Sequence, residues 1–208
     1  YTWEVYVNGE RKSCTKLVET YVDGLIPGKR NIVKLVCGNR EHVIGITTDM
    51  ESATIDVRDC GAKGDGAHDD TTNIQAASAA CPEGGRVLIP AGDYRVKSLF
   101  LKSGISIELA EGSQLLARHD RAELAYIPGT LKGTLGLGRE ASDLFPLGRW
   151  EGESISTYCS LLTGLHVHDV SIYGRGVIDG QTDFSEDNWW HNVKDFYRPE
   201  EGREIARP

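Results

Sequence analysis

The chain has 208 residues, of which 39% are hydrophobic and 26% are charged, and its formal net charge is −8 at pH 7. A nonspecific nucleic-acid-binding protein needs a basic surface, so this charge argues against that class of protein. The same overall field would repel an acidic polymer, so binding one would require local basic groups. No apolar run is long enough to span a bilayer, so we expect no role in a membrane.

The first strands of the chain are predicted by alternation. Trp3, Val5 and Val7 occupy alternate positions just before Asn8-Gly9. An Asn-Gly pair after an alternating apolar run is a strong signal for a β-hairpin with a two-residue turn. The chain therefore begins with a predicted antiparallel hairpin.

The remainder of the first fifty residues also predicts a β-structure. A Gly-Leu-x-Pro-Gly turn at 24–28 comes before the apolar run 32–36, and residues 43–47 form a last predicted strand. A turn of this kind before a strand resembles a fibronectin type III domain. Such a sandwich has about seven strands, and only its later strands can be placed here. We therefore expect a partial fibronectin type III-like domain over residues 1–50, beginning inside the domain.

A glycine-rich turn leads from the next segment into a short helix. Gly61, Gly64 and Gly66 supply backbone angles that other residues adopt only with strain. Asp69 and Asp70 then stand where a helix needs side-chain acceptors for its unpaired amides. The helix has one narrow face of small and apolar residues, at positions 74, 77, 78 and 81. Such a helix is suited to closing the open end of a stack of coils.

Short alternating strands follow the helix, with glycine or proline breaks between them. Their apolar positions are Val87 and Ile89, Tyr94 and Val96, Leu99 and Leu101, Ile105, Ile107 and Leu109, and Leu115 with Ala117. Short, evenly spaced strands fit a sandwich, a barrel or a coil of parallel strands. All three alternatives belong to the all-β class, which is the predicted fold class, and the preceding helix favours the coil of parallel strands.

The turn and helix carry a family resemblance. Gly-Ala-Lys-Gly-Asp-Gly at 61–66, with Asp-Asp-Thr at 69–71, is similar to the opening of the pectin-lyase-like right-handed parallel β-helix proteins. The resemblance implies that residues 54–208 form the N-terminal part of such a β-helix, with the helix as its cap. We expect further coils beyond residue 208.

Later segments narrow the resemblance. Val-Ser-Ile-Tyr-Gly-Arg-Gly-Val-Ile-Asp-Gly-Gln at 170–181, followed by Trp189-Trp190, resembles glycoside hydrolase family 28, the polygalacturonases. Residues 98–104 and 108–116 are also similar to that family. The family resemblance implies an inverting hydrolase that cleaves α-1,4-galacturonosyl bonds in pectin without a metal or cofactor. Its partners would be polygalacturonate or oligogalacturonides.

The catalytic residues of that family are not found in this chain. The family carries Asn-Thr-Asp, Asp-Asp, Gly-His-Gly and Arg-Ile-Lys motifs, with aspartates as acid and base. The chain contains one Asp-Asp pair, Asp69-Asp70, which lies at the start of the helix, far upstream of the family's catalytic pair. Asp179 precedes a glycine and is interpreted as a turn residue. We therefore assign no catalytic residue and expect the isolated chain to be inactive.

Candidate substrate contacts lie in a long stretch where the strand pattern lapses, between Arg118 and Trp150. Long loops in compact folds are often functional, and this one ends in a segment that looks like one seen in exo-acting family members. We hypothesise that it forms a wall at one end of a sugar groove. Four residues are the candidate substrate contacts: Arg149, Trp150, Glu151 and Trp190. An arginine matches the geometry of a uronate carboxylate, while a tryptophan serves equally for sugar stacking or for packing.

Metal and redox roles have little support in the sequence. The five cysteines are an odd number without Cys-x-x-Cys spacing, so no metal site is predicted. His166 and His168 could meet a metal from one strand face, but this spacing, with Asp169 at a turn, is more typical of exposed polar residues. The acidic residues near 65–70 lack the glutamate of a calcium loop. Cys60 and Cys81 flank the helix and could form a disulfide in an oxidising compartment, with buried thiols as the alternative.

Two other functions remain open on the sequence. The parent protein could be a non-catalytic polysaccharide-binding β-helix of the phage-tailspike kind, or a pectate lyase that uses calcium and a basic proton abstractor. The compartment is also open, because an enzyme acting on polymer would be secreted or periplasmic and one acting on imported oligomers would be cytoplasmic.

Overall fold

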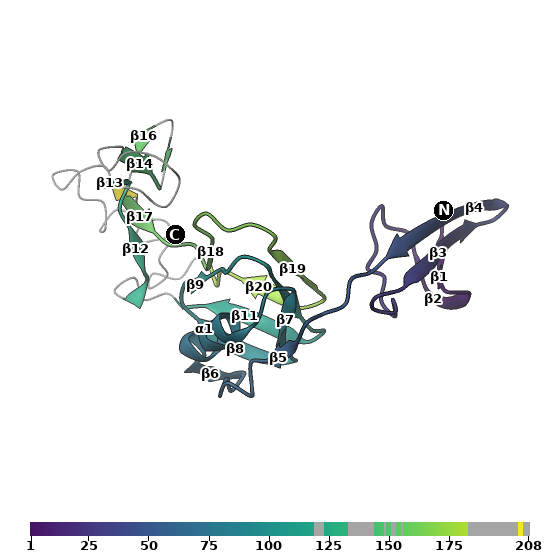
Figure 1. Cartoon of the computed structure of the whole chain (residues 1–208), viewed down its shortest axis with the longest axis horizontal. Helices are drawn as coiled ribbons and strands as arrows, with labels where there is room; N and C mark the ends of the chain where they lie inside the picture. The colour runs from purple at the N-terminus through teal and green to yellow at the C-terminus, as the bar shows by residue number, and fades with distance from the viewer. Residues whose placement is uncertain are drawn as a thin grey trace. The chain divides into compact units, whose positions relative to one another are not determined.

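The computed structural model describes residues 1–118, 123–132, 144–147, 149–150, 153–154, 156–182 and 204–205. The chain divides into two compact units, Tyr1–Ala53 and Thr54–Pro208 (Figure 1). This boundary lies close to the one that the sequence predicts. Each unit is described by itself.

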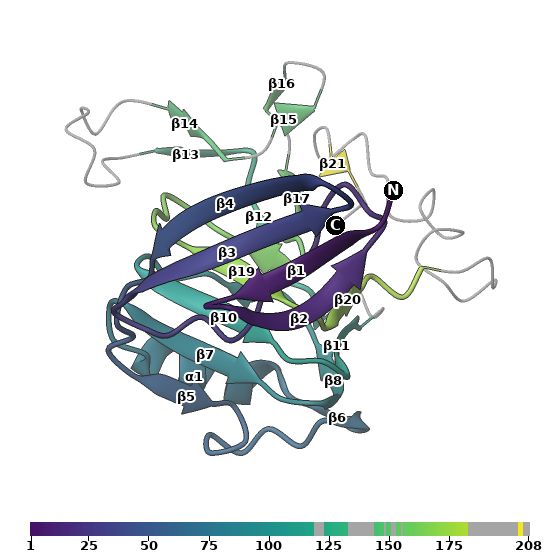
Figure 2. The same cartoon turned by 90° about the vertical axis from the view of Figure 1, so that its right-hand side faces the viewer.

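The first unit is one antiparallel sheet of four strands in the order β2-β1-β3-β4 (Figure 2). The strands are β1 (Trp3–Val7), β2 (Glu10–Thr15), β3 (Arg30–Cys37) and β4 (Arg40–Thr47). Asn8 and Gly9 join β1 to β2 with φ values of 50° and 88°, as a two-residue hairpin turn requires. The predicted hairpin is therefore confirmed.

The two faces of this sheet differ in chemistry. One face carries the buried side chains of Val5, Val7 and Val33. The opposite face carries ion pairs, including Arg11 Nη2 to Glu4 Oε1 at 3.1 Å. A sheet of this kind suits half of a sandwich, but a second sheet is not seen in residues 1–53, so the fibronectin type III-like domain stays a prediction.

The second unit is built from parallel strands stacked in three sheets. One sheet has the order β19-β10-β7-β5, the next β20-β11-β8-β6, and a short one pairs β18 with β9. Successive strands of each sheet pair in parallel, so the chain climbs by one coil before it returns to the same sheet. The predicted all-β class, with a parallel β-helix, is confirmed. The strands are β5 (Thr54–Asp56), β6 (Asp65–Asp69), β7 (Gly85–Ile89), β8 (Gly92–Val96), β9 (Leu99–Phe100), β10 (Ile105–Leu109), β11 (Ser113–Ala117), β18 (Leu162–Thr163), β19 (Ser171–Gly174) and β20 (Val177–Asp179).

The core of the coils is filled by the alternate residues that the sequence picks out. The fully buried members include Val87, Ile89, Tyr94, Val96, Ile105 and Leu115. Because a strand turns successive side chains to opposite faces, each short strand delivers two or three of them inward. The interior of the β-helix is thus an apolar stack whose pattern is legible in the sequence.

Helix α1 (Thr71–Ala80) covers the start of the coils, with Ile74, Ala77 and Ser78 buried. Gln75 forms two hydrogen bonds with the backbone of Phe100 in β9: its Nε2 donates to the carbonyl at 2.9 Å, and its Oε1 accepts from the amide at 2.8 Å. The side-chain amide replaces a neighbouring strand at the edge of β9. The predicted cap is therefore confirmed, and it closes an edge that would otherwise be open to pairing.

The sequence predicts that Asp69 and Asp70 both cap the helix, but their side chains have different partners in the structure. Asp69 accepts a hydrogen bond from the Thr71 amide at 3.1 Å, as a capping residue does. Asp70 makes no side-chain capping bond, which corrects the prediction. Its buried carboxylate accepts instead from the amides of Lys63 at 2.7 Å and Gly64 at 2.9 Å. Asp70 therefore holds the glycine turn, because each of its two carboxylate oxygens accepts a hydrogen bond from an amide of that turn.

Candidate functional site

The long stretch after β11 is an arm made of short strands. We call residues 123–158 the arm. Its described strands are β12 (Tyr126–Ile127), β13 (Thr130–Lys132), β14 (Leu144–Pro146), β15 (Arg149–Trp150), β16 (Glu153–Ser154) and β17 (Ser156–Tyr158). These strands pair antiparallel as β12 with β17, β13 with β14, and β15 with β16. The stretch that the sequence interprets as a loop thus contains regular pairing, which alternation could not reveal in strands so short.

The arm returns to the coils beside the short sheet of β9 and β18. The amide of Cys159 donates to the Ala125 carbonyl at 2.8 Å and closes the base of the arm. The Ser98 hydroxyl donates to the Cys159 carbonyl at 3.3 Å, which ties that base to the coils. Figure 1 shows β12 and β17 leading away from the coils near β9 and β18. The arm therefore has a fixed root, and its root borders the β9–β18 sheet.

Exposed aromatic side chains lie in this region. The rings of Tyr126 and Tyr158 meet edge to face with centroids 5.6 Å apart, and Tyr126 is 45% exposed. Phe100 in β9 is 42% exposed. Aromatic faces are suited to contact with the apolar faces of sugar rings. The sequence does not reveal the tyrosine pair, because the two residues are far apart in the chain and only the β12–β17 pairing brings them together.

A cluster of four charged side chains also lies at the root of the arm: Asp69, Lys97, Arg118 and Glu123. Burial by itself would raise the pKa of Asp69. Hydrogen bonds from Thr71 and the nearby Lys97 ammonium outweigh burial and hold that pKa below its ordinary value. Asp69 is therefore an ionised partner of cations, which does not suit it to act as a general acid.

The structure describes the backbones of two of the four predicted contact residues. The backbones of Arg149 and Trp150 form β15, where Arg149 pairs with Ser154 and Trp150 with Glu153. Glu151 and Trp190 lie outside the described residues. The later segment nevertheless reaches the arm, because β21 (Glu204–Ile205) pairs in parallel with β17. Residues Glu204–Ile205 are thus joined to the arm by one small sheet, which does not include β15.

The remaining candidate residues have structural roles. Asp179 accepts hydrogen bonds from the Gln181 amide at 2.7 Å and from its side chain at 2.8 Å, which confirms its turn role. All five cysteines are free, and burial raises the pKa of the Cys81 and Cys159 thiols, so neither is an activated nucleophile.

The described parts of the chain contain no group of three or more residues that could hold a metal ion. In the same parts, no helix combines the length and apolar character needed to cross a membrane.

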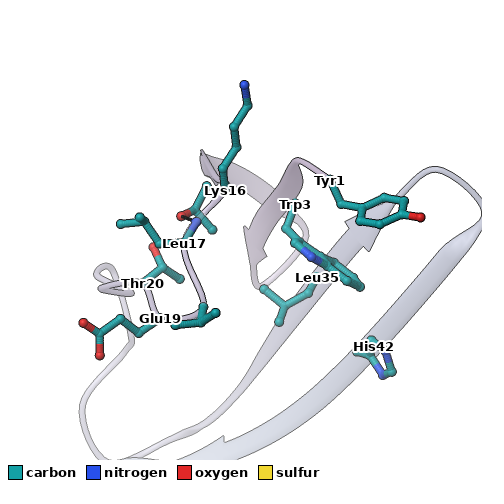
Figure 3. Close-up of a pocket in the computed structure, with 10 residues that line it drawn as sticks. Tyr1, Trp3, Lys16, Leu17, Glu19, Thr20, Leu35 and His42 are labelled. Carbon is teal, nitrogen blue, oxygen red and sulfur yellow. Dashed lines mark hydrogen bonds between the residues drawn. The ribbon is translucent and has the colours of Figure 1, made fainter.

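A pocket of about 470 Å³ lies in the first unit, on the apolar side of its sheet (Figure 3). Trp3 and Leu35 project from the sheet, and residues of the segment after β2 complete the lining. The rings of Trp3 and His42 lie 5.8 Å apart. Glu19 is the one carboxylate among its lining residues, so this pocket lacks the paired carboxylates of a catalytic centre.

Comparisons with known proteins match the chain to a family model and to several relatives. Residues 54–108 match the family model described as rhamnogalacturonase A/epimerase, pectate lyase-like. The chain is 31% identical over 144 residues to an exo-poly-α-D-galacturonosidase from Dickeya chrysanthemi, covering 68% of this chain and 22% of that relative. It is 32% identical over 143 residues to alginate lyase 7 from Azotobacter vinelandii, covering 68% of this chain and 14% of that relative.

A solved structure shares the fold. The family 28 exopolygalacturonase of Yersinia enterocolitica superposes with a TM-score of 0.57 at 21% identity, covering 86% of this chain and 36% of that one. This likeness shows the fold, and the match to the galacturonosidase confirms the predicted resemblance to polygalacturonases. The chain spans less than a quarter of the length of either curated relative.

Proposed function

We propose that this chain, whose second unit is the N-terminal part of a pectin-lyase-like β-helix of the polygalacturonase type, is part of a glycoside hydrolase that cleaves α-1,4-galacturonosyl bonds. The observation that carries this proposal is the 31% identity to an exo-poly-α-D-galacturonosidase over 68% of the chain. The substrates would be polygalacturonate or oligogalacturonides. The parallel coils and the arm are consistent with a groove for an extended sugar chain.

The proposed reaction is hydrolysis with inversion, which needs a carboxylic acid and a carboxylate about 6.5–9.5 Å apart. The conspicuous aspartate pair in this chain is committed elsewhere, because Asp70 is buried against backbone amides and Asp69 pairs with Lys97 at 3.0 Å. We therefore propose that coils outside this chain supply the acid and the base. The isolated chain should release no reducing ends from polygalacturonate.

The proposed role of the arm is to form a wall at one end of the groove, which would favour exo action. Strand β15 places Arg149 in the arm, in a hairpin with β16. A guanidinium can bind a uronate carboxylate with two parallel hydrogen bonds. We propose that Arg149 makes this contact and that Trp150, Glu151 and Trp190 line the same end of the groove.

The test is the affinity of the full-length protein for a galacturonate oligomer after substitution of Arg149 by alanine. Loss of a charged hydrogen-bonded pair costs about 1.5–3 kcal/mol, so we expect affinity to fall roughly 10-fold to 100-fold. Arg11→Ala is the matched control, because Arg11 pairs with Glu4 in the first unit. Unchanged affinity in the Arg149 variant, measured by calorimetry, would contradict the contact.

A lyase is the second candidate, and the 32% identity to an alginate lyase favours it. A lyase removes a proton next to the uronate carboxylate and leaves an unsaturated sugar, whereas a hydrolase adds water and leaves none. Product analysis therefore separates the two candidates. A non-catalytic binding protein would release neither product.

A further inference from the structure

We propose that Glu123 is a positioning residue, which locks the arm to the coils by pairing with Lys97 and Arg118. Arg118 Nη2 lies 2.8 Å from Glu123 Oε2, and Lys97 Nζ lies 3.6 Å from the same oxygen. The pairing of Glu123 with Lys97 and Arg118 is formed by residues of this chain and does not depend on the proposed function. Its consequence for substrate binding rests on the proposed function, in which the arm forms a wall of the groove.

The partners of Glu123 form a column on the coils. Asp69 ends β6, Lys97 follows β8, and Arg118 follows β11. These three strands are neighbours in one parallel sheet, so the three residues leave it at the same corner of successive coils. The column therefore consists of one anion followed by two cations along the stack, and its last member, Arg118, lies nearest in the sequence to the arm.

Both cations of the column are shared between two anions. Lys97 Nζ lies 3.0 Å from Asp69 Oδ2, and Arg118 Nη1 lies 3.7 Å from the same oxygen. All four side chains are only 27–34% exposed. Charges at this depth interact more strongly than fully exposed pairs, and a network of several pairs holds its members better than an isolated pair does.

Three of the four residues are fixed by the coils themselves. The Lys97 amide donates to the Thr71 hydroxyl at 2.8 Å, the Arg118 amide donates to the Val96 carbonyl at 2.9 Å, and Asp69 caps the helix. Glu123 comes from the arm, two residues before Ala125, which closes the base of the arm. Of the four, Glu123 is thus the member whose pairing couples the arm to the coils.

The lock is tested by hydrogen exchange on this chain, comparing wild type with Glu123→Gln. The amides of Gly129, Leu147 and Cys159 report on the arm, because their hydrogen bonds lie within it or at its base. We expect these amides to exchange at least about tenfold faster in the variant, while coil amides such as Ala110 stay unchanged. High salt should accelerate arm exchange in the wild type more than in the variant, because salt screens the pairs that the variant lacks.

The matched control is Glu111→Gln. Glu111 pairs with Arg175 at 3.6 Å between neighbouring turns of the coils, away from the arm. This control should leave the three arm amides at wild-type rates. Unchanged arm exchange in Glu123→Gln, or equal acceleration of arm and coil amides, would overturn the lock.

The consequence for substrate is tested by kinetics of the full-length protein. With the arm loosened, Glu123→Gln should raise KM for digalacturonate at least about fivefold and leave kcat within about twofold, because a positioning residue outside the reacting centre affects binding. Glu123→Asp should recover part of the loss. Faster arm exchange with unchanged KM would overturn the role in substrate binding. A full-length wild type that is inactive on every galacturonan would instead refute the proposed function, and the exchange result would still decide the lock.

Discussion

At the scale of single residues, the glycine turn before the helix is held by close contacts with the first coil. Gly64 has φ of +60°, and a methyl group at its Cα would lie 2.8 Å from the ring of Tyr94, which is fully buried. Gly66 has φ of +73°, but a methyl group there would meet Asp93 at an ordinary 3.4 Å. Substitutions at both positions would cause backbone strain, whereas only a substitution at Gly64 would also cause steric overlap.

We expect Gly64→Ala to destabilise the second unit more than Gly66→Ala does. Both substitutions incur the cost of a left-handed backbone, about 1–2 kcal/mol. The Gly64 variant adds overpacking against a buried ring, which costs about 1–3 kcal/mol more. Urea unfolding of the two variants measures the difference. Equal stabilities would show that the ring of Tyr94 moves aside without cost.

The pKa of Asp69 predicts how stability depends on pH. An unfolded aspartate has a pKa of about 4, and the folded value is lower, so the unfolded state binds the proton more tightly. The stabilisation from Asp69 is therefore complete above about pH 4 and is lost as pH falls through the folded pKa. We expect the stability difference between wild type and Asp69→Asn to be largest near neutral pH and to shrink in acid. Unfolding free energies across that range are the measurement, and a difference that does not vary with pH would contradict this role.

At the scale of elements, helix α1 is held to β9 by the side-chain amide of Gln75, which forms two hydrogen bonds with the Phe100 backbone. The Gln75→Met variant keeps the length of the side chain but removes both hydrogen bonds to the Phe100 backbone. We expect the loss of two hydrogen bonds to lower the free energy of unfolding by about 1–2 kcal/mol. Gln114→Met is the control, because Gln114 makes one bond, to Asp93 at 2.9 Å. The Phe100 amide should exchange faster in the Gln75 variant alone. Unchanged exchange would mean that this edge is held by other contacts.

The elements also show what the sequence could and could not predict. Alternation was sufficient for β7, β8, β10 and β11, because one face of each strand is buried in an apolar stack. It failed for the arm, because the described strands there are only two or three residues long, too short to show an alternating pattern. The charged cluster was also missed, since its members become neighbours only through the stacking of coils. Arg149 and Trp150 could be placed in the arm by resemblance, whereas the Tyr126–Tyr158 contact needed the pairing of β12 with β17.

At the scale of the whole molecule, the chain joins a four-stranded antiparallel sheet to the first coils of a β-helix. The apolar side of that sheet keeps open the prediction of a fibronectin type III-like sandwich. These coils carry the cap, the charged column and the root of the arm, and the one Asp-Asp pair of the chain is engaged by the glycine turn and by Lys97. Within the proposed function, the described side chains of these coils would shape and border the groove.

The most direct test of this account is product analysis of the full-length protein with polygalacturonate and digalacturonate, in the presence of EDTA. A hydrolase that needs no calcium should release saturated galacturonate, and exo action should release it as monomer from both substrates. The isolated 208-residue chain should release nothing under the same conditions. Unsaturated products that form only without EDTA, or no product from the full-length protein, would contradict the account.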